Sequence, residues 1–285
     1  MIKIENLKKK FKHVIALNDV SFSVEKGSFF SILGKNGAGK STTIGIIMSL
    51  IKKDSGKIFI KNYDMDKDVS IIKTLIGFMP QEYNFNQFET VIDIITNQAG
   101  FYGIKKSDAI KHADVLLKKF DLWNFKFSIS MNLSGGLKRR LMLIRSLIHK
   151  PEILILDEPT AGVDIISRRL IWDYLKEINF NGTTIILTSH YLEEIEKLCT
   201  DVAIIDKGSI ILKTTVSNLI NKINNKIFIL ELEEEGGKKK QIEILLNKND
   251  NLNNELNLLI KNNILIKNIK NKTNDLEELF ITLTN

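Results

Sequence analysis

The stretch SFFSILGKNGAGKST, residues 28–42, decides the fold of this sequence. Its first six residues are mostly apolar and follow Gly27, which predicts a short strand. Three glycines then share a six-residue loop, and a helix is predicted from about residue 40 to residue 50. A strand that passes through a glycine-rich loop into a helix is the structural context of a phosphate-binding loop.

Residues 34–41 match the phosphate-loop pattern throughout. Gly34, Gly37 and Gly39 let the backbone curl so that its N–H groups point at phosphates, and the helix N-terminus adds positive potential. Lys40 places a charge at the β- and γ-phosphates, and the Ser41 hydroxyl suits Mg²⁺. The predicted nucleotide-binding residues of this loop are Gly34, Lys35, Asn36, Gly37, Ala38, Gly39, Lys40, Ser41 and Thr42.

The sequence ILILDE, residues 153–158, supplies the acidic partner of such a loop. Its first four residues are wholly apolar, as in a parallel strand buried on both faces. Asp157, at the strand end, is predicted to hold Mg²⁺ through water, and Glu158 is the candidate general base for an attacking water.

Two further polar residues are predicted at the same edge of the sheet. His190 follows the predicted strand 183–188 and could bond the γ-phosphate and the water. Gln81, in GFMPQE, could reach Mg²⁺ or the water through its amide. Read alone, the histidine would be structural and the glutamine a surface residue. The predicted catalytic residues are thus Glu158, His190 and Gln81, and the predicted metal-site residues are Ser41, Gln81 and Asp157.

The segment NLSGGLKRRL, residues 132–141, forms a second anion site in the prediction. Ser134, Gly135 and Gly136 make a glycine turn that leads into a helix over residues 134–149. One nucleotide needs only one such phosphate-binding turn. The second turn therefore indicates a nucleotide held by another copy of the chain.

Strands alternate with helices along most of the chain, which predicts an α/β fold with a mainly parallel sheet. The remaining predicted strands include 14–24, a run after Gly56, and two that flank residues 206–208. Residues 90–120, 165–178 and 191–198 are predicted to be helical.

Composition changes near residue 216 to a segment rich in Asn and Lys. Strands at 226–233, 240–246 and 264–270, a turn at Gly236-Gly237 and helices at 252–261 and 275–283 predict a small α+β domain; the alternative is a floppy extension. Its predicted core residues are Ile227, Ile229, Ile242, Ile244, Leu256, Leu259, Ile264, Ile266, Leu276, Leu279 and Phe280.

Charge and cysteine content narrow the class of protein. The formal net charge is +7, which suits anionic ligands or an anionic membrane surface, and also permits nucleic-acid binding; codon bias toward Lys is the plain alternative. A single cysteine, Cys199, excludes an internal disulfide and fits a reducing compartment. We expect neither a signal peptide nor a membrane-spanning helix.

The motifs, taken in order, resemble those of the ATP-binding subunits of ABC transporters. The resemblance runs from about residue 2 to residue 215 and rests on GKNGAGKST, MPQE, LSGGLKRR, LILDEPTAGVD and TSH. It implies a P-loop NTPase with a RecA-like core, an antiparallel β subdomain and a helical subdomain, with ATP and Mg²⁺ as cofactors. Residues 1–215 would form this ATPase domain, and residues 216–285 an accessory C-terminal α+β domain.

The resemblance also implies a partner copy. Two copies would stack head to tail, so that Ser134, Gly135 and Gly136 contact the γ-phosphate bound by the other copy. Asp164 would organise the interface between them. Gln81 would couple Mg²⁺ to a membrane-embedded permease subunit, which would contact the helical region between residues 81 and 133.

Two positions depart from the common family pattern. Phe11 falls where the family usually stacks a tyrosine on adenine, and its ring keeps the π face; a core aromatic is the alternative. Leu137 replaces the glutamine that often follows LSGG, which leaves the glycines and the helix dipole intact.

The finer resemblance is to the ATPases of two-gene exporters of drugs, polysaccharides or antibiotics. It implies an ATPase that powers export of an unknown substrate, attached peripherally to the cytoplasmic face of the inner membrane, with no nucleic acid expected.

The rival hypothesis is a soluble ABC protein that acts on ribosomes or DNA. Such proteins usually carry two cassettes or a long coiled coil, whereas Ser134 lies only 23 residues before Asp157 here. A third hypothesis, compatible with transport, makes residues 216–285 a tethering or regulatory module.

Overall fold

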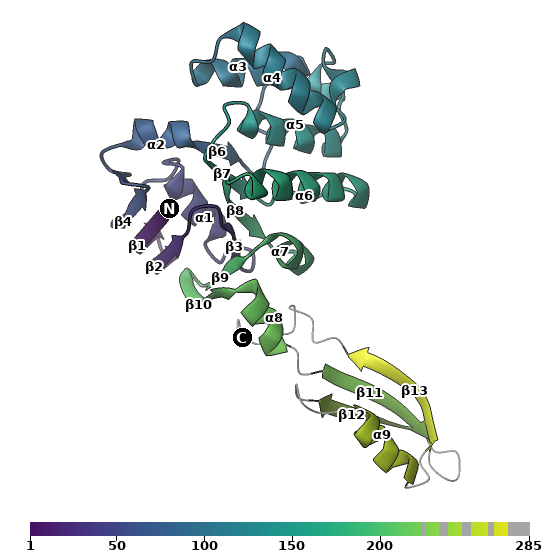
Figure 1. Cartoon of the computed structure of the whole chain (residues 1–285). Coiled ribbons are helices and arrows are strands. Elements are labelled where there is room, and N and C mark those ends of the chain that lie inside the picture. The colour runs from purple at the N-terminus through teal and green to yellow at the C-terminus, as the bar shows by residue number, and fades with distance from the viewer. Residues whose placement is uncertain (224–225, 234–238, 247–251, 262–264, 273–285) are drawn as a thin grey trace. The chain divides into compact units, whose positions relative to one another are not determined.

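The computed structural model describes residues 1–285 except 224–225, 234–238, 247–251, 262–264 and 273–285 (Figure 1). It divides into two compact units, Met1–Thr214 and Thr215–Asn285. No helix in the described part of the chain is long and apolar enough to cross a bilayer.

A six-stranded sheet forms the centre of the first unit, in the order β10-β9-β3-β8-β7-β6. Every residue of its central strands β3, β8 and β7 is buried, and these strands pair in parallel, as a sheet covered on both faces requires. The strands are β3 (Phe29–Leu33), β6 (Ile76–Met79), β7 (Ile153–Asp157), β8 (Thr184–Ser189), β9 (Asp201–Asp206) and β10 (Ser209–Thr215).

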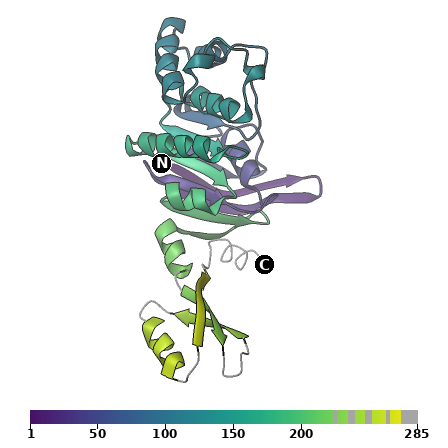
Figure 2. The same ribbon diagram turned by 90° about the vertical axis from the view of Figure 1, so that its right-hand side faces the viewer.

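A second, antiparallel sheet of four strands has the order β2-β1-β4-β5. It contains β1 (Ile2–Phe11), β2 (Val14–Val24), β4 (Ser55–Ile60) and β5 (Tyr63–Asp64). Figure 2 shows the long ribbon that β1 and β2 form. The helix α1 (Lys40–Ile47) lies between the two sheets, since one buried cluster joins Ile4 of β1, Ile44 of α1 and Ile155 of β7.

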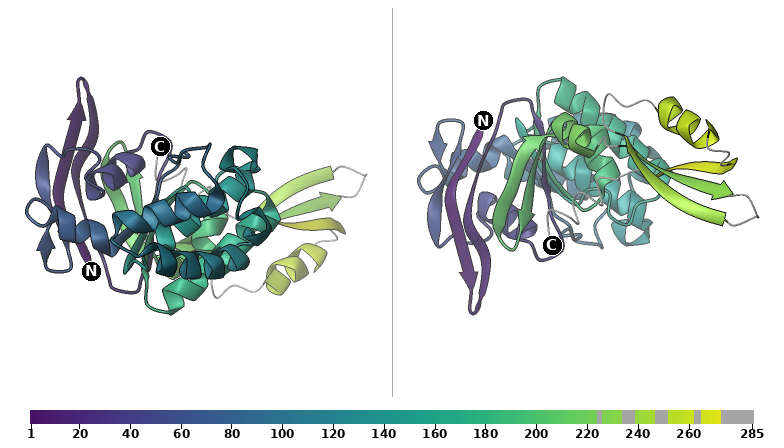
Figure 3. Two further views of the ribbon diagram at one scale, coloured as in Figure 1. Left: turned by 90° about the horizontal axis from the view of Figure 1, so that it is seen from above. Right: turned by 90° about the horizontal axis from the view of Figure 1, so that it is seen from below.

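Helices cover the rest of the first unit. α6 (Ile165–Phe180) and α7 (Leu192–Leu198) lie on the face of the parallel sheet that is turned away from α1, and α2 (Val69–Leu75) precedes β6 (Figure 1). A helical layer adjoins the β6 edge (Figure 3, left). It consists of α3 (Val91–Phe101), α4 (Lys106–Lys119), α5 (Gly135–Leu147) and two 3₁₀ turns, η1 (Trp123–Phe125) and η2 (Ser130–Asn132).

The second unit contains α8 (Val216–Ile223) and an antiparallel sheet in the order β12-β11-β13, with α9 beside it (Figure 3, right). Its strands are β11 (Lys226–Glu233), β12 (Lys239–Leu246) and β13 (Leu265–Lys272), and α9 spans Leu252–Lys261. The predicted core list omitted Leu230 and Leu232, both of which are buried. Five predicted core residues are half-buried, namely Ile242, Ile244, Leu256, Leu259 and Ile266.

Several predictions for the second unit fall outside the described residues. They are the Gly236-Gly237 turn, the helix at 275–283, and the side chains of the core positions Ile227, Ile229, Ile264, Leu276, Leu279 and Phe280. In the first unit, the P-loop fold, the antiparallel sheet and the helical layer are confirmed. Sequence reasoning missed β1 altogether and placed β4 two residues late.

Candidate nucleotide site

The phosphate loop connects the carboxyl end of β3 to the first turn of α1. Two of its glycines are required by close packing. A Cβ on Gly34 would lie 2.5 Å from the Ile205 carbonyl oxygen, and one on Gly39 would lie 2.8 Å from the Ala16 carbonyl oxygen. Gly39 also has φ +113°, a backbone conformation that side chains disfavour. The loop therefore curls tightly against its neighbours.

The ammonium group of Lys40 lies inside this curl. Its Nζ donates to the carbonyl oxygens of Gly34 at 2.7 Å and Lys35 at 3.1 Å, and the residue is 5% exposed. Burial lowers the pKa of Lys40, while the negative charges of Glu158 and Asp157 oppose that shift. An anionic ligand in the loop would strengthen the charged form.

Asp157 ends β7 directly opposite the loop. Its Oδ1 accepts from the Ser41 hydroxyl at 3.4 Å and from the Thr188 hydroxyl. Parallel pairing explains the meeting, because Asp157 of β7 lies in register with Thr188 of β8. A hydroxyl, a carboxylate and the nearby Gln81 amide are hard oxygen ligands, so the donor set fits Mg²⁺.

Glu158 contacts the other two predicted catalytic residues, Gln81 and His190. Its Oε2 accepts from Gln81 Nε2 at 3.1 Å, and its Oε1 lies 3.2 Å from His190 Nδ1. The Glu158 backbone has φ +50° and is held there by its N–H, which donates to both the carbonyl and the hydroxyl oxygen of Thr188. Strained backbone of this kind is concentrated at functional sites.

The phosphate loop, Gln81 and Glu158 border a cavity of about 350 Å³. Its lining residues are Asn36, Gly37, Gly39, Lys40, Ser41, Thr42, Gln81 and Glu158. Most of the predicted loop residues thus share one cavity with two of the predicted catalytic residues.

The four predicted nucleotide contacts outside the phosphate loop do not line this cavity. Ser134 is an exposed N-cap of α5 and accepts from the Leu137 N–H at 3.4 Å, and it leads into Gly135 and Gly136. Phe11 ends β1 with 44% of its surface exposed, and Lys9 Nζ lies 5.0 Å from the centre of its ring. All four face solvent at least in part within one copy of the chain.

Sequence reasoning missed two residues at this site. Thr188 binds both Asp157 and the Glu158 N–H, and its position at a strand end just before Ser189-His190 was the available signal. Arg139 donates to main-chain carbonyl groups of the loops around the cavity, and its sequence context carried no signal for those acceptors.

Comparisons with known proteins agree with this architecture. The model of the family described as ABC transporter matches residues 17–161. The linearmycin resistance ATP-binding protein LnrL of Bacillus subtilis is 38% identical over 229 residues, which cover 80% of this chain and 74% of that protein. The Nod factor export ATP-binding protein I of Bradyrhizobium diazoefficiens is 35% identical over 208 residues, covering 73% and 68% of the two chains.

A solved structure of an ATP-binding cassette extends the comparison. It is a dimer in a post-hydrolysis state bound to ADP and Pi, and it superimposes with a TM-score of 0.71 at 26% identity. The match covers 76% of this chain and 99% of that one.

The fold and the site define a P-loop ATPase. The chain belongs to the ABC transporter family, as an ATP-binding subunit with an ATPase domain. Its relatives include export proteins, and cassettes of its fold have been solved as dimers.

Proposed function

We propose that the chain is the motor of an exporter, in which two copies close on ATP and separate after hydrolysis. One observation supports this most strongly: each copy carries a complete phosphate loop and, apart from it, an exposed Ser134-Gly135-Gly136 turn at the N-terminus of α5. Each copy would complete the other's site, and Phe11 would stack on adenine. Asp164, which caps α6 by accepting from the Ser167 N–H at 2.9 Å, would border the interface.

Hydrolysis would take place at Glu158. Its carboxylate would accept a proton from the attacking water, Gln81 would orient that water, and His190 would bond the γ-phosphate. Ser41, Asp157 and Gln81 would hold Mg²⁺, which neutralises phosphate charge when bound. Lys40 would exchange its bonds to loop carbonyls for bonds to phosphate oxygens.

Glu158→Gln tests this assignment. The variant keeps the side-chain shape but removes the base, so turnover should fall by about 10²-fold or more while ATP still binds. Light scattering should then detect an ATP-dependent dimer. Glu152→Gln, at the opposite end of β7 where it pairs with Lys61, is the matched control and should behave like the wild type. A Glu158→Gln chain that hydrolyses ATP normally would contradict the assignment.

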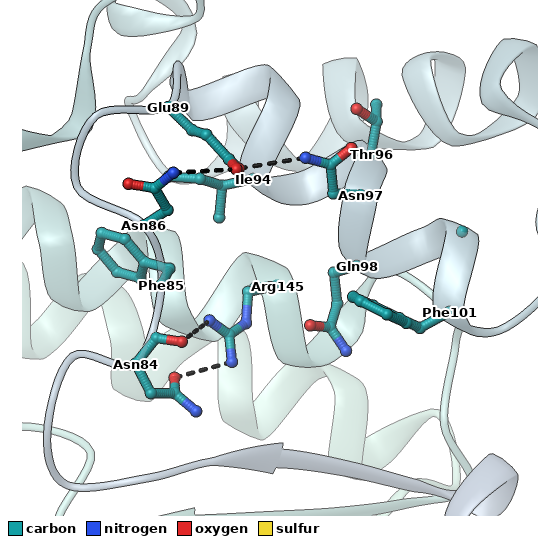
Figure 4. Close-up of a pocket in the computed structure, with 11 residues that line it drawn as sticks. Asn84, Phe85, Asn86, Glu89, Ile94, Thr96, Asn97, Gln98, Phe101 and Arg145 are labelled. Atoms are coloured by element: carbon teal, nitrogen blue, oxygen red, sulfur yellow. Dashed lines mark hydrogen bonds between the residues drawn. The ribbon is translucent and has the colours of Figure 1, made fainter.

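The membrane partner is proposed to dock on the helical layer. A pocket of about 610 Å³ opens there between residues 84–89 and α3 (Figure 4). Arg145 donates to the Asn84 carbonyl oxygen at 3.1 Å and to its side-chain oxygen at 2.8 Å, while Glu89 accepts from Asn97 at 3.1 Å. Phe101, 85% exposed, lies at the rim and offers apolar contact to a segment of a permease.

A pull-down tests the export proposal. Tagged Glu158→Gln would be recovered with ATP from detergent-solubilised membranes and its partners identified by mass spectrometry. We expect a multi-spanning membrane protein, and Phe101→Asp should lose it while ATP binding persists. Recovery of ribosomal proteins or nucleic acid would leave the ATPase intact but contradict transport. Residues 216–285 are proposed to be an accessory module of this assembly, on the peripheral cytoplasmic side of the membrane.

A further inference from the structure

One buried arginine on α5 binds the main chain of two loops at the nucleotide site. Arg139 is 2% exposed, and its guanidinium donates to five carbonyl oxygens. The acceptors are the carbonyl groups of Pro80 (3.4 Å), Gln81 (2.5 Å), Asp157 (3.0 Å), Glu158 and Pro159 (2.9 Å). Only the planar guanidinium fork offers enough directed N–H groups for such a set.

Nearby acids make this buried charge tolerable. Burial lowers the pKa of Arg139, and the charges of Asp157, Glu158 and Glu194, together with Tyr83, oppose that shift. Of these acids, Glu158 lines the nucleotide cavity, and Asp157 accepts from the hydroxyl of Ser41, which also lines it. Arg139 is therefore tied both to the backbone and to the charges of its own catalytic site.

The segment 80–84 is fastened to α5 at two further points. The Tyr83 hydroxyl donates to the Gly135 carbonyl oxygen at 3.1 Å, at the first residue of the helix. Arg145, in its last turn, donates to Asn84. Because the contacts lie along the whole length of α5, a displacement of Gln81 toward a nucleotide would carry the helix with it.

We propose that Arg139 couples the two ATP sites of the dimer. When Gln81 and Glu158 close around the nucleotide of one copy, Arg139 transmits that movement along α5 to Ser134. Ser134 lies at the N-terminus of α5 and contacts the nucleotide of the other copy. This inference rests on the proposed head-to-tail dimer. Arg139 touches no nucleotide and acts as a positioning residue.

The Arg139→Lys variant tests whether the hydrogen bonds of Arg139 to both loops, rather than its positive charge alone, couple the two sites. A lysine keeps the positive charge opposite Asp157 and Glu158, but its single ammonium cannot reach both loops in the geometry of the guanidinium. Arg140→Lys is the matched control. Arg140 is the next residue of α5, yet it donates to the Phe120 carbonyl oxygen at 2.9 Å and to Ser167 Oγ at 3.3 Å, away from the cavity.

The experiment measures steady-state hydrolysis by the full chain across ATP concentrations, together with binding of a fluorescent ATP analogue to the dilute monomer. Wild type and Arg140→Lys should hydrolyse ATP cooperatively, with a Hill coefficient above one. Arg139→Lys should show a Hill coefficient near one and a kcat lower by about tenfold, while the monomer binds the analogue almost as tightly as wild type.

Two results would overturn the inference alone: an Arg139→Lys chain as cooperative as wild type, or a loss of analogue binding that matches the loss of kcat, which would mean local support only. A wild type without cooperativity, together with a Glu158→Gln chain that stays monomeric in ATP, would instead overturn the dimer proposal on which the inference depends.

Discussion

At the scale of single residues, the site depends on backbone positions that a side chain or a lost bond would disturb. Glu158 has a left-handed backbone held by two bonds from its N–H to Thr188. The sequence motifs predicted which residue types meet at the site, because the carboxyl ends of parallel strands lie at the same edge of the sheet. They could not predict that Arg139 fixes those residues, since its main-chain acceptors leave no mark in the sequence. Thr188 was missed although its position at a strand end was a signal.

Gly39→Ala should damage the phosphate loop. The new methyl group would lie 2.8 Å from the Ala16 carbonyl oxygen at a φ of +113°, so we expect a loss of about 1–3 kcal/mol in stability and weaker ATP binding. Gly182→Ala is the control, because Gly182 has φ +98° but nothing within 4 Å of its Cβ position. Urea unfolding and ATP titration measure both effects. Equal losses in the two variants would exclude the contact with Ala16 as the cause.

His149 should make stability depend on pH. Its ring stacks on Tyr102 at 3.6 Å, Nε2 donates to the Ile76 carbonyl oxygen at 3.1 Å, and burial lowers its pKa to about 4. Because the unfolded chain binds the proton more readily, stability is full above about pH 6.5 and falls as pH drops toward 4.

Allowing for partial exposure, the titration of His149 lowers the free energy of unfolding at pH 5 by about 1 kcal/mol relative to pH 7. His149→Phe keeps a ring against Tyr102 but cannot titrate, so its unfolding free energy should change less between pH 7 and pH 5 than that of wild type. Urea unfolding at both pH values gives the difference. The same pH dependence in both chains would show that His149 does not titrate on unfolding.

At the scale of elements, short apolar runs predicted the buried strands β3, β7 and β8, but no pattern predicted β1. The register of β1 against β2 shifts between Ile4 and Leu7, and Asn6 there has φ +48°. A bulge of this kind breaks the two-residue alternation on which strand prediction depends. The sequence of β11 begins with a continuous apolar run after Lys226, so alternation alone did not single out Leu230 and Leu232 as buried.

Thr90→Ala should weaken α3, the helix that borders the proposed docking pocket. Thr90 is its N-cap, and its hydroxyl oxygen accepts from the Asp93 N–H at 3.3 Å. Loss of the cap should cost about 1 kcal/mol, whereas Thr90→Ser should retain most of that stability. Urea unfolding of the two variants measures the difference. If serine proved as costly as alanine, the methyl group rather than the cap would be responsible.

At the scale of the whole molecule, the chain has two compact units, and every element that borders the nucleotide cavity belongs to Met1–Thr214. The order of motifs was enough to predict the ATPase architecture. The second unit has no comparable motif, so its role was not predictable from residue chemistry.

A chain of residues 1–215 should keep the ATPase. This truncation retains β10, the last strand of the central sheet, and all residues that line the nucleotide cavity. ATP affinity and basal hydrolysis should match those of the full chain, measured side by side. Loss of ATP binding in a truncated chain that still shows a cooperative melt would mean that residues 216–285 support the site directly.

The central claim, that each ATP is shared by two copies, can be tested most directly by mixing two inactive variants. Lys40→Ala disables the phosphate loop, and Ser134→Arg blocks the turn that serves the other copy. In a mixed dimer one site combines an intact loop with an intact turn. The mixture should therefore regain hydrolysis, up to about a quarter of the wild-type rate, although each variant alone is inactive. A mixture as inactive as its components would contradict the shared site.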